Sequence, residues 1–392
     1  MKNNIKLLTL GLACAAFGFV ACDDADYATS DMGVHAFLNE SSTNKNVKIT
    51  VGANGGDAEV NVCLSNVAPD DAKFRLEFDQ EVLDNYNRKQ ASSYVMAPAE
   101  IVEFEREALI KKGEFNAPST KIHVKKIPTE LSGEPYAIAL RLVSEDKVVP
   151  VTNTTSTFVI PLEEIIISDL PCFNGGANLH CDGFPMELPQ FTVEVRFQIS
   201  NTSNRNRAVF TNGGSVLLRF EDPQSANAQF QAHSLVQFQG EGWYLNPDKS
   251  FAPNKWQHLA MTYDGTTTRL YVNGAFAGSK DGHCKPTFGS AWWFGGESGG
   301  GHGTGGSWWT GCKIMLAEAR IWSVCRTESQ IVNNMTGTSA KSEGLVGYWR
   351  CNDGKGQEFK DYTGNGHTMK TSEKVTWVKN VPSTAEATPW PF

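Results

Sequence analysis

Basic residues are scarce in this chain of 392 residues, in which 35 Lys and Arg stand against 43 Asp and Glu, a formal net charge of −8. Nucleic-acid binding needs a basic face that neutralises phosphates, so the charge argues against a nucleic-acid partner. After residue 21 the sequence also lacks an apolar run of about 20 residues, the length that a transmembrane helix needs. The sequence therefore excludes a helical span in the rest of the chain.

The first residues have the composition of an export signal. Lys2 and Lys6 precede an uncharged apolar run over residues 7–21, and small residues lead into Cys22. This is the pattern of a secretory signal with a positive n-region and an apolar h-region. Phe19-Val20-Ala21-Cys22 resembles the lipobox of bacterial lipoproteins, with Phe in place of the usual Leu. The alternative is a plain signal peptide in which Cys22 is incidental.

The lipobox resemblance implies that residues 1–21 are removed and that Cys22 carries lipid. Removal of two lysines and no acids changes the charge from 35 − 43 = −8 to 33 − 43 = −10. Residues 22–32 then form an acidic linker, whose Asp23, Asp24 and Asp26 resemble the surface-export tag of Bacteroidetes lipoproteins. We expect a protein anchored in the outer membrane by lipid alone and exposed at the cell surface.

The cysteines fit an oxidising compartment better than a zinc site. A zinc site needs several Cys or His ligands at short spacing. No two of the nine cysteines have CxxC spacing, and His180 is the only histidine close to Cys172 and Cys181. We therefore expect disulfides in the C-terminal half, with 15 pairings open. Cys172 with Cys181 is the first choice because a short, glycine-containing loop separates them. The six cysteines are Cys172, Cys181, Cys284, Cys312, Cys325 and Cys351.

Residues 33–165 alternate apolar and polar residues in short stretches, as half-buried strands do. Residues 80–89 instead have helical spacing and predict a short helix. Cys63 is out of phase with Val62 and Leu64, which predicts an unreactive thiol on the other strand face. Leu83-Asp84-Asn85-Tyr86-Asn87 and Lys112-Gly113-Glu114 resemble the β-sandwich domain that follows the lipobox in many Bacteroidetes surface lipoproteins. The resemblance implies an immunoglobulin-like spacer without chemistry of its own.

Residues 166–385 contain nearly all the tryptophans and most of the glycines. Asn273-Gly274 between apolar runs is a strong hairpin signal. Trp256-Gln257-His258-Leu259-Ala260, Leu270-Tyr271-Val272-Asn273-Gly274 and Leu316 to Trp322 resemble, in order, the laminin-G-like, concanavalin A-like jelly-roll family. The fold class is thus all-β, with two β-sandwich domains, the second a jelly roll. That family includes lectin-like modules, adhesive modules and glucanases, so the fold does not choose among them.

A catalytic pair of carboxylates is missing from the second domain. Glucanases of this fold place Glu-x-Asp-x-Glu on one strand, and retaining hydrolysis needs two carboxylates about 5 Å apart. Glu194 and Glu318 each stand alone and are interpreted as structural, each in an ion pair or a hydrogen bond at a strand end. The spelling Gly296-Glu297-Ser298-Gly299-Gly300 matches a nucleophile elbow but lacks the helix that this motif requires. A glycan hydrolase of this fold and a protein-binding adhesion module remain the alternatives to a non-catalytic carbohydrate-binding protein.

The candidate ligand site is a glycine-rich loop, residues 297–306, which is flanked by tryptophans on both sides. Exposed aromatic rings stack on the apolar faces of sugars, while neighbouring polar groups bind the hydroxyls. The family resemblance implies that Trp309 occupies a core position. Because adjacent strand residues face opposite ways, we then expect Trp308 and one of Trp292 and Trp293 to face outward. The competing interpretation is that the rings only pack over the end of the sandwich, beneath the loop, and bind no ligand. The candidate residues are Trp308, Trp292, Trp293, Glu297 and His302, with Trp243 and Tyr244 as a further pair.

The sequence implies no organic cofactor. Calcium stays open because laminin-G-like and lectin folds often bind it near the rim, and it needs six to eight oxygen ligands. Asp182, Asp264 and Asp361 lie near turns, where hydrogen bonding to the turn explains them equally well. The expected partner is an extracellular glycan, and outer-membrane glycan-uptake proteins are further candidates.

The lipid anchor can be tested directly. Cys22→Ala removes the only residue that the lipobox can modify, so the protein should move from the membrane fraction to the soluble fraction and lose labelling by radioactive palmitate. Labelling at the wild-type level in Cys22→Ala would exclude lipidation at this cysteine.

Overall fold

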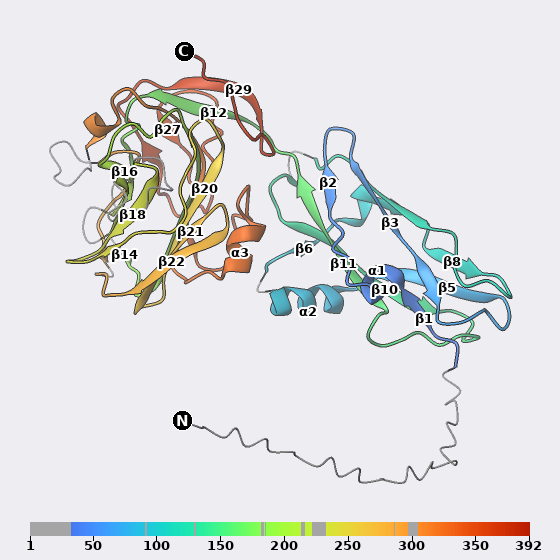
Figure 1. Cartoon of the computed structure of the whole chain (residues 1–392). Helices are drawn as coiled ribbons and strands as arrows, with labels where there is room; N and C mark the ends of the chain where they lie inside the picture. Colours follow the sequence, from blue (N-terminus) through green and yellow to red (C-terminus); the bar gives the residue numbers. More distant parts are fainter. Residues whose placement is uncertain are drawn as a thin grey trace, which may run out of the picture.

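A computed structural model describes residues 33–90, 92–128, 131–181, 184, 186–212, 216–221, 233–285, 287–296 and 305–392. Strands make up most of the regular structure, and they gather in two bodies, one blue to green and one green to red in Figure 1. The two hydrophobic cores share no residue: one draws on residues 36–162 and the other on residues 173–369. The predicted all-β fold with two sandwiches is confirmed.

The N-terminal sandwich has one larger sheet, in the order β2-β11-β10-β5-β8 with β6 paired to β10. A three-stranded sheet, β3-β9-β7, and the pair β1-β4 complete it. The larger sheet consists of β2 Ile49–Val51, β5 Ala72–Phe78, β6 Val95–Met96, β8 Glu107–Ile110, β10 Tyr136–Ser144 and β11 Thr157–Glu164. The others are β1 Ala36–Leu38, β3 Gly56–Val60, β4 Val62–Leu64, β7 Val102–Phe104 and β9 Thr120–Val124.

The predicted helix is present as α2, Gln80–Gln90, and two shorter helical segments are α1, Asn39–Ser42, and η1, Ala99–Ile101. Asp79 caps α2, because its carboxylate accepts the Val82 N–H at 3.0 Å. Val82 and Leu83 bury the apolar face of α2 against β10. Within the described residues, no helix is long and apolar enough to span a membrane.

The C-terminal body is a jelly roll of two eight-stranded sheets, with order β22-β21-β20-β15-β25-β12-β29 plus β26 in sheet 1 and order β19-β18-β17-β16-β24-β13-β28-β27 in sheet 2. Sheet 1 contains β12 Ile167–Asn174, β15 Phe191–Ile199, β20 Gln257–Tyr263, β21 Thr267–Val272, β22 Ala275–Asp281, β25 Lys313–Trp322, β26 Leu345–Trp349 and β29 Thr376–Pro382. Sheet 2 contains β13 Leu179–Cys181, β16 Arg207–Thr211, β17 Leu217–Glu221, β18 Leu235–Gln239, β19 Tyr244–Leu245, β24 Ala291–Trp293, β27 Glu358–Phe359 and β28 Met369–Lys370. The remaining elements are β14 Met186–Glu187, β23 Thr287–Phe288, η3 Gly306–Trp309 and α3 Glu328–Asn333.

The predicted hairpin at Asn273-Gly274 joins β21 to β22. Asn273 and Gly274 have φ of 51° and 79°. Both values lie in the left-handed region that a tight two-residue hairpin turn demands, and Asn and Gly adopt it most readily. The turn residues therefore fix the register of this sheet edge.

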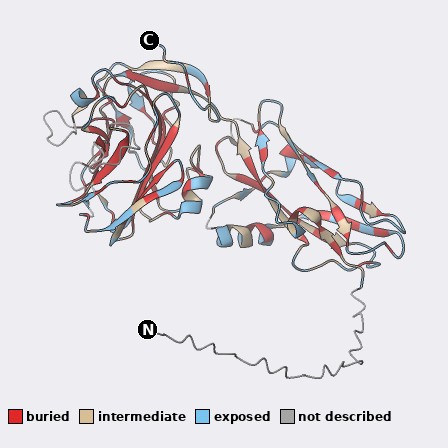
Figure 2. Cartoon of the chain, in the orientation of Figure 1, coloured by how far each residue is buried: buried red, intermediate tan, exposed pale blue. Residues whose placement is uncertain are grey.

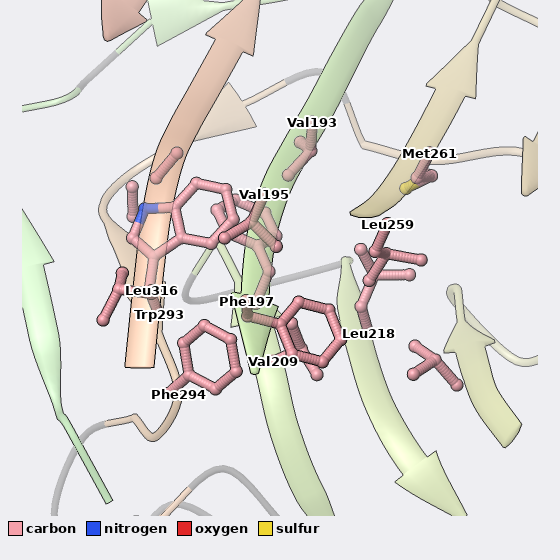
Figure 3. Packing of buried hydrophobic residues seen from close by; sticks show 14 of the residues in the cluster. Val193, Val195, Phe197, Val209, Leu218, Leu259, Met261, Trp293, Phe294 and Leu316 are labelled. Atoms are coloured by element: carbon pink, nitrogen blue, oxygen red, sulfur yellow. The ribbon is translucent and has the colours of Figure 1, made fainter. Parts of the chain in front are cut away.

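The jelly-roll core lies between the two sheets. Val193, Val195 and Phe197 of β15 point toward side chains of sheet 2 such as Leu218 and Trp293 (Figure 3). All five side chains have 0% or 1% exposure. Figure 2 shows buried residues concentrated along the strands of this body. The inward-facing half of the alternating pattern therefore forms the core, as the sequence predicted.

The outward-facing half of β15 is buried as well, although it is polar. Glu194 has no exposed surface, and its carboxylate lies 3.2 Å from Arg320 and 2.8 Å from Arg326. His258 Nε2 is 3.3 Å from the same carboxylate. Burial alone would raise the pKa of Glu194, but these three groups outweigh it and hold the pKa below its usual range.

Glu318 belongs to the same group of ion pairs. Its carboxylate accepts hydrogen bonds from Arg320 at 2.7 Å and from the Tyr348 hydroxyl at 2.6 Å. Glu194 and Glu318 are thus structural, as their isolated positions in the sequence predicted. Removing one partner of a buried ion pair costs about 3–5 kcal/mol, because an unpaired charge is left inside.

The C-terminal strap, residues 383–392, covers part of this polar face. Thr388 forms two hydrogen bonds with the Gln198 side chain, at 2.7 and 2.8 Å. The Glu386 carbonyl accepts the Trp256 N–H, and Trp390 Nε1 donates to the Asn254 side chain. These bonds satisfy polar groups that the strap itself removes from water, so the outer face of sheet 1 is covered where the strap crosses it.

The structure does not bear out the predicted disulfides: it forms none among the seven cysteines of the described residues. The first-choice pair lies on different sheets, since Cys172 is on β12 of sheet 1 and Cys181 is on β13 of sheet 2. Most of these cysteines are buried and pack as small apolar side chains. Cys63 lies half-buried on the face of β4 opposite Val62 and Leu64, as predicted.

Thiol reactivity tests this correction. Burial raises the pKa of Cys172 to about 12 and that of Cys284 to about 11, which suppresses the reactive thiolate. Iodoacetamide should therefore modify both slowly in the native protein and completely after denaturation without reductant, with mass spectrometry as the readout. Disulfide-linked peptides from the unreduced protein would contradict the structure.

Candidate functional site

A cleft of about 730 Å³ opens at one end of the jelly roll. It lies where the β12–β13 loop, the start of η3 and the β28–β29 loop meet, and this volume falls within the range of about 300–1,000 Å³ common for ligand sites. The described lining residues are Phe173, Asn174, Gly175, Gly176, Asn178, Gly296, Gly305, Gly306, Ser307, Thr310, Gly311, Glu373, Lys374, Thr376 and Phe392. The cleft is thus lined largely by polar groups and bare backbone.

Glycines let the cleft walls approach each other. A Cβ on Gly176 would lie 2.6 Å from Gly306 Cα, so only glycine allows this backbone contact. Gly305 is different: its backbone is extended, with φ −69° and ψ 146°, and among the described residues an added Cβ would meet only Ser307 Oγ, at 3.7 Å. Gly305 therefore has room for a side chain without a clash.

Asn178 holds the wall together. Its own φ is 43°, its Nδ2 donates to Glu373 Oε1 at 2.9 Å, and its Oδ1 accepts the Gly296 N–H at 3.3 Å. A Cβ on Gly306 would lie 2.3 Å from Asn178 Nδ2, so the amide also packs on that backbone. One side chain thus links the β12–β13 loop to both ends of the tryptophan-flanked glycine loop and to Glu373.

Trp308 and Trp309 point in different directions, as predicted, but for another reason. They lie on η3 rather than on a strand, and successive residues of such a helix are rotated by about 120°. Trp308 is 36% exposed and stands between the lining residues Ser307 and Thr310. Trp309 is fully buried against Phe220 and donates from Nε1 to a backbone carbonyl.

Trp292 and Trp293 likewise split between surface and core. Trp293 has 0% exposure and packs against Phe210, so it is not a surface residue. Trp292 is half-buried on the outer face of sheet 2, where it stacks on His180 with ring centroids 4.4 Å apart. Trp292 pairs with one end of β16, whereas the Trp308 carbonyl accepts from Arg207 at the other end. Four residues of strand, about 13 Å, separate these positions.

The second aromatic pair lies on another edge of the domain. Tyr244 begins β19, the edge strand of sheet 2, and is 44% exposed. Trp243 packs against Phe238, and a Cβ on Gly282 would lie 2.4 Å from its ring. The structure therefore does not bring Trp243 and Tyr244 together with the cleft. Glu297 and His302, the two polar candidates, lie outside the described residues.

The described calcium candidates are engaged by their own turns. Asp264 accepts the N–H groups of Thr266 and Thr267, and Asp361 accepts those of Thr363 and His367. Asp182 lies outside the described residues. Over the part of the chain that the structure describes, no cluster of three metal-ligating His, Cys, Asp or Glu side chains occurs.

Two family models match separate segments of the chain. Residues 174–332 match the family model of the concanavalin A-like lectin/glucanases superfamily, and residues 29–149 match a model of an N-terminal domain. The chain therefore combines an N-terminal domain of that type with a C-terminal laminin-G-like, concanavalin A-like jelly roll. No curated protein matches the chain.

Solved structures extend the likeness over most of the chain. A protein of Bacteroides ovatus, proposed to bind carbohydrate, is similar over 89% of this chain and 99% of its own, with a TM-score of 0.54 and 21% identity. A two-domain protein of unknown function from Bacteroides fragilis covers 76% of this chain and 92% of its own, with a TM-score of 0.31 and 13% identity. The first likeness shows the shared fold.

Several cleft residues were not predicted from the sequence. Asn178 and Glu373 are 195 positions apart, and no local pattern connects them. Phe392 lies at the end of the strap, beyond residue 385, where the predicted jelly roll ends. Gly305 and Gly306, by contrast, belong to the glycine-rich loop that the sequence indicated as the candidate ligand site.

The two tryptophans of η3 should respond differently to truncation. Trp309→Ala removes a fully buried ring and should lower the free energy of unfolding by about 3–5 kcal/mol, whereas Trp308→Ala should change it by less than about 1 kcal/mol. Chemical denaturation of both variants measures this. Equal losses would mean that Trp308 is also a core residue.

Proposed function

We propose that this protein is a cell-surface lipoprotein whose jelly roll binds a glycan in the glycine-walled cleft without cleaving it. The cleft is the observation that carries the proposal. Its bare backbone lets a ligand approach closely, and Asn174, Asn178, Ser307 and Thr310 supply hydrogen-bonding groups of the kind that recognise hydroxyls. Trp308 is not among the described lining residues, but it directly follows Ser307 in the chain and is 36% exposed.

The carboxylates favour binding over hydrolysis. Glycoside hydrolysis with two carboxylates needs one of them as an acid and the other as a base or nucleophile. Among the described lining residues Glu373 is the acidic side chain, and one of its oxygens accepts from Asn178. Glu194 and Glu318, the isolated acids of the strands, are held by Arg320 away from the cleft.

The export signal supports a surface location in this proposal. Lys2, Lys6, the apolar run and Cys22 favour a lipid anchor, and the acidic residues that follow favour transfer to the outer surface. The N-terminal sandwich then separates the cleft from the membrane. Glycan-uptake proteins of the outer membrane are the partners that such a position would serve.

Filling the cleft tests its role. Gly305→Leu should place a side chain in the cleft at an extended position that has room for it, so the melting temperature should stay within a few degrees. Gly289→Leu is the matched control, because a Cβ there has no neighbour within 4 Å and Gly289 does not line the cleft. On a glycan array, Gly305→Leu should lose binding and Gly289→Leu should keep it.

Trp308→Ala adds a second arm to this experiment. It should weaken binding of the best array ligand at unchanged stability. If Gly305→Leu binds that ligand as the wild type does, the cleft is not the site, and Trp292 with His180 becomes the next position to test. Release of reducing ends from the bound polysaccharide would contradict the non-catalytic assignment and favour the hydrolase alternative.

A further inference from the structure

The C-terminal strap ends at the candidate cleft. Thr388 is bonded to Gln198, Trp390 donates to Asn254, and the last residue, Phe392, is part of the cleft lining. These anchors precede Phe392 and do not involve its ring. These hydrogen bonds hold the strap as far as Trp390, and Lys313 contacts Phe392 itself.

Phe392 offers an apolar surface that the fold does not use for packing. The residue is 51% exposed although it is large and apolar. Lys313, the first residue of β25, fixes it from one side: Lys313 Nζ donates to the Phe392 oxygen at 3.1 Å and lies 5.7 Å from the ring centroid. An exposed ring held in place loses little conformational freedom on binding, which favours it as a stacking surface.

The charges in the cleft offset one another. Glu373 and Lys374 are the charged side chains among the described lining residues, one of each sign. Lys313 and the Phe392 oxygen satisfy each other beside them. Among the described lining residues, a ligand with a carboxylate or sulfate on every ring would find no surplus of positive charge, whereas a neutral sugar needs none.

We propose that the cleft binds a neutral pyranose chain and that Phe392 is its stacking residue, with the hydroxyls directed toward Ser307, Lys374 and the glycine backbone. This inference rests on the proposed function, because it names the ligand class and a specificity-determining residue of the same cleft. Phe392 stacks on the apolar C–H face of one ring, which charged substituents would not improve.

Calorimetric titration of the purified protein with defined hexasaccharides tests this. The probes are cellohexaose, mannohexaose and xylohexaose as neutral chains and hexagalacturonic acid as the acidic one. Phe392→Ala should weaken binding of the best neutral probe about tenfold, and Phe392→Trp should keep it within about threefold. Phe115→Ala is the matched control, because Phe115 is 49% exposed and belongs to the N-terminal sandwich, so it should leave affinity unchanged.

The outcomes separate this inference from the proposed function. If Gly305→Leu abolishes binding and Phe392→Ala does not change it, the cleft is supported as the binding site and the stacking role of Phe392 is refuted. Tighter binding of hexagalacturonic acid than of every neutral probe overturns the ligand class. Failure of the wild type to bind any probe overturns the inference together with the glycan-binding function.

Discussion

The buried carboxylate of Glu194 is the constraint around which the jelly roll is organised. A charge without exposed surface is tolerated only when protein groups neutralise it, and here Arg320 of β25 and Arg326 in the segment after it do so. Arg320 Nη1 also donates to the Asn334 carbonyl, which ties down the segment after α3. One acid thus fixes two neighbouring strands and the segment that crosses them.

Burial of this polar face has a consequence at the end of the domain. The residues of β15 are all buried: Arg320 and Arg326 cover Glu194, and the C-terminal strap covers Gln198 through Thr388. The strap leads Phe392 to the cleft, where Asn178 holds the opposite wall to Glu373. The interactions that stabilise the sheet therefore also shape the cleft that we propose as the glycan site. The isolated acids of the same strands are engaged in ion pairs.

The sequence was sufficient where structure is decided locally. The alternation of the strands, the helix at residues 80–90 and the Asn273-Gly274 turn each depend on a few neighbouring residues, and all were predicted correctly. Cysteine number, by contrast, says nothing about distance, and Cys172 and Cys181 lie on opposite sheets. The cleft was missed for a related reason: its walls join segments far apart in the chain, and the position of Phe392 depends on hydrogen bonds that no pattern in its own neighbourhood encodes.

A crystal structure of the protein with its tightest-binding neutral hexasaccharide tests the central claim most directly. The account predicts sugar density in the cleft beside Gly305, with one pyranose ring parallel to Phe392 and an uncleaved glycosidic bond. Density over Trp292 and His180 on sheet 2, with an empty cleft, would contradict it.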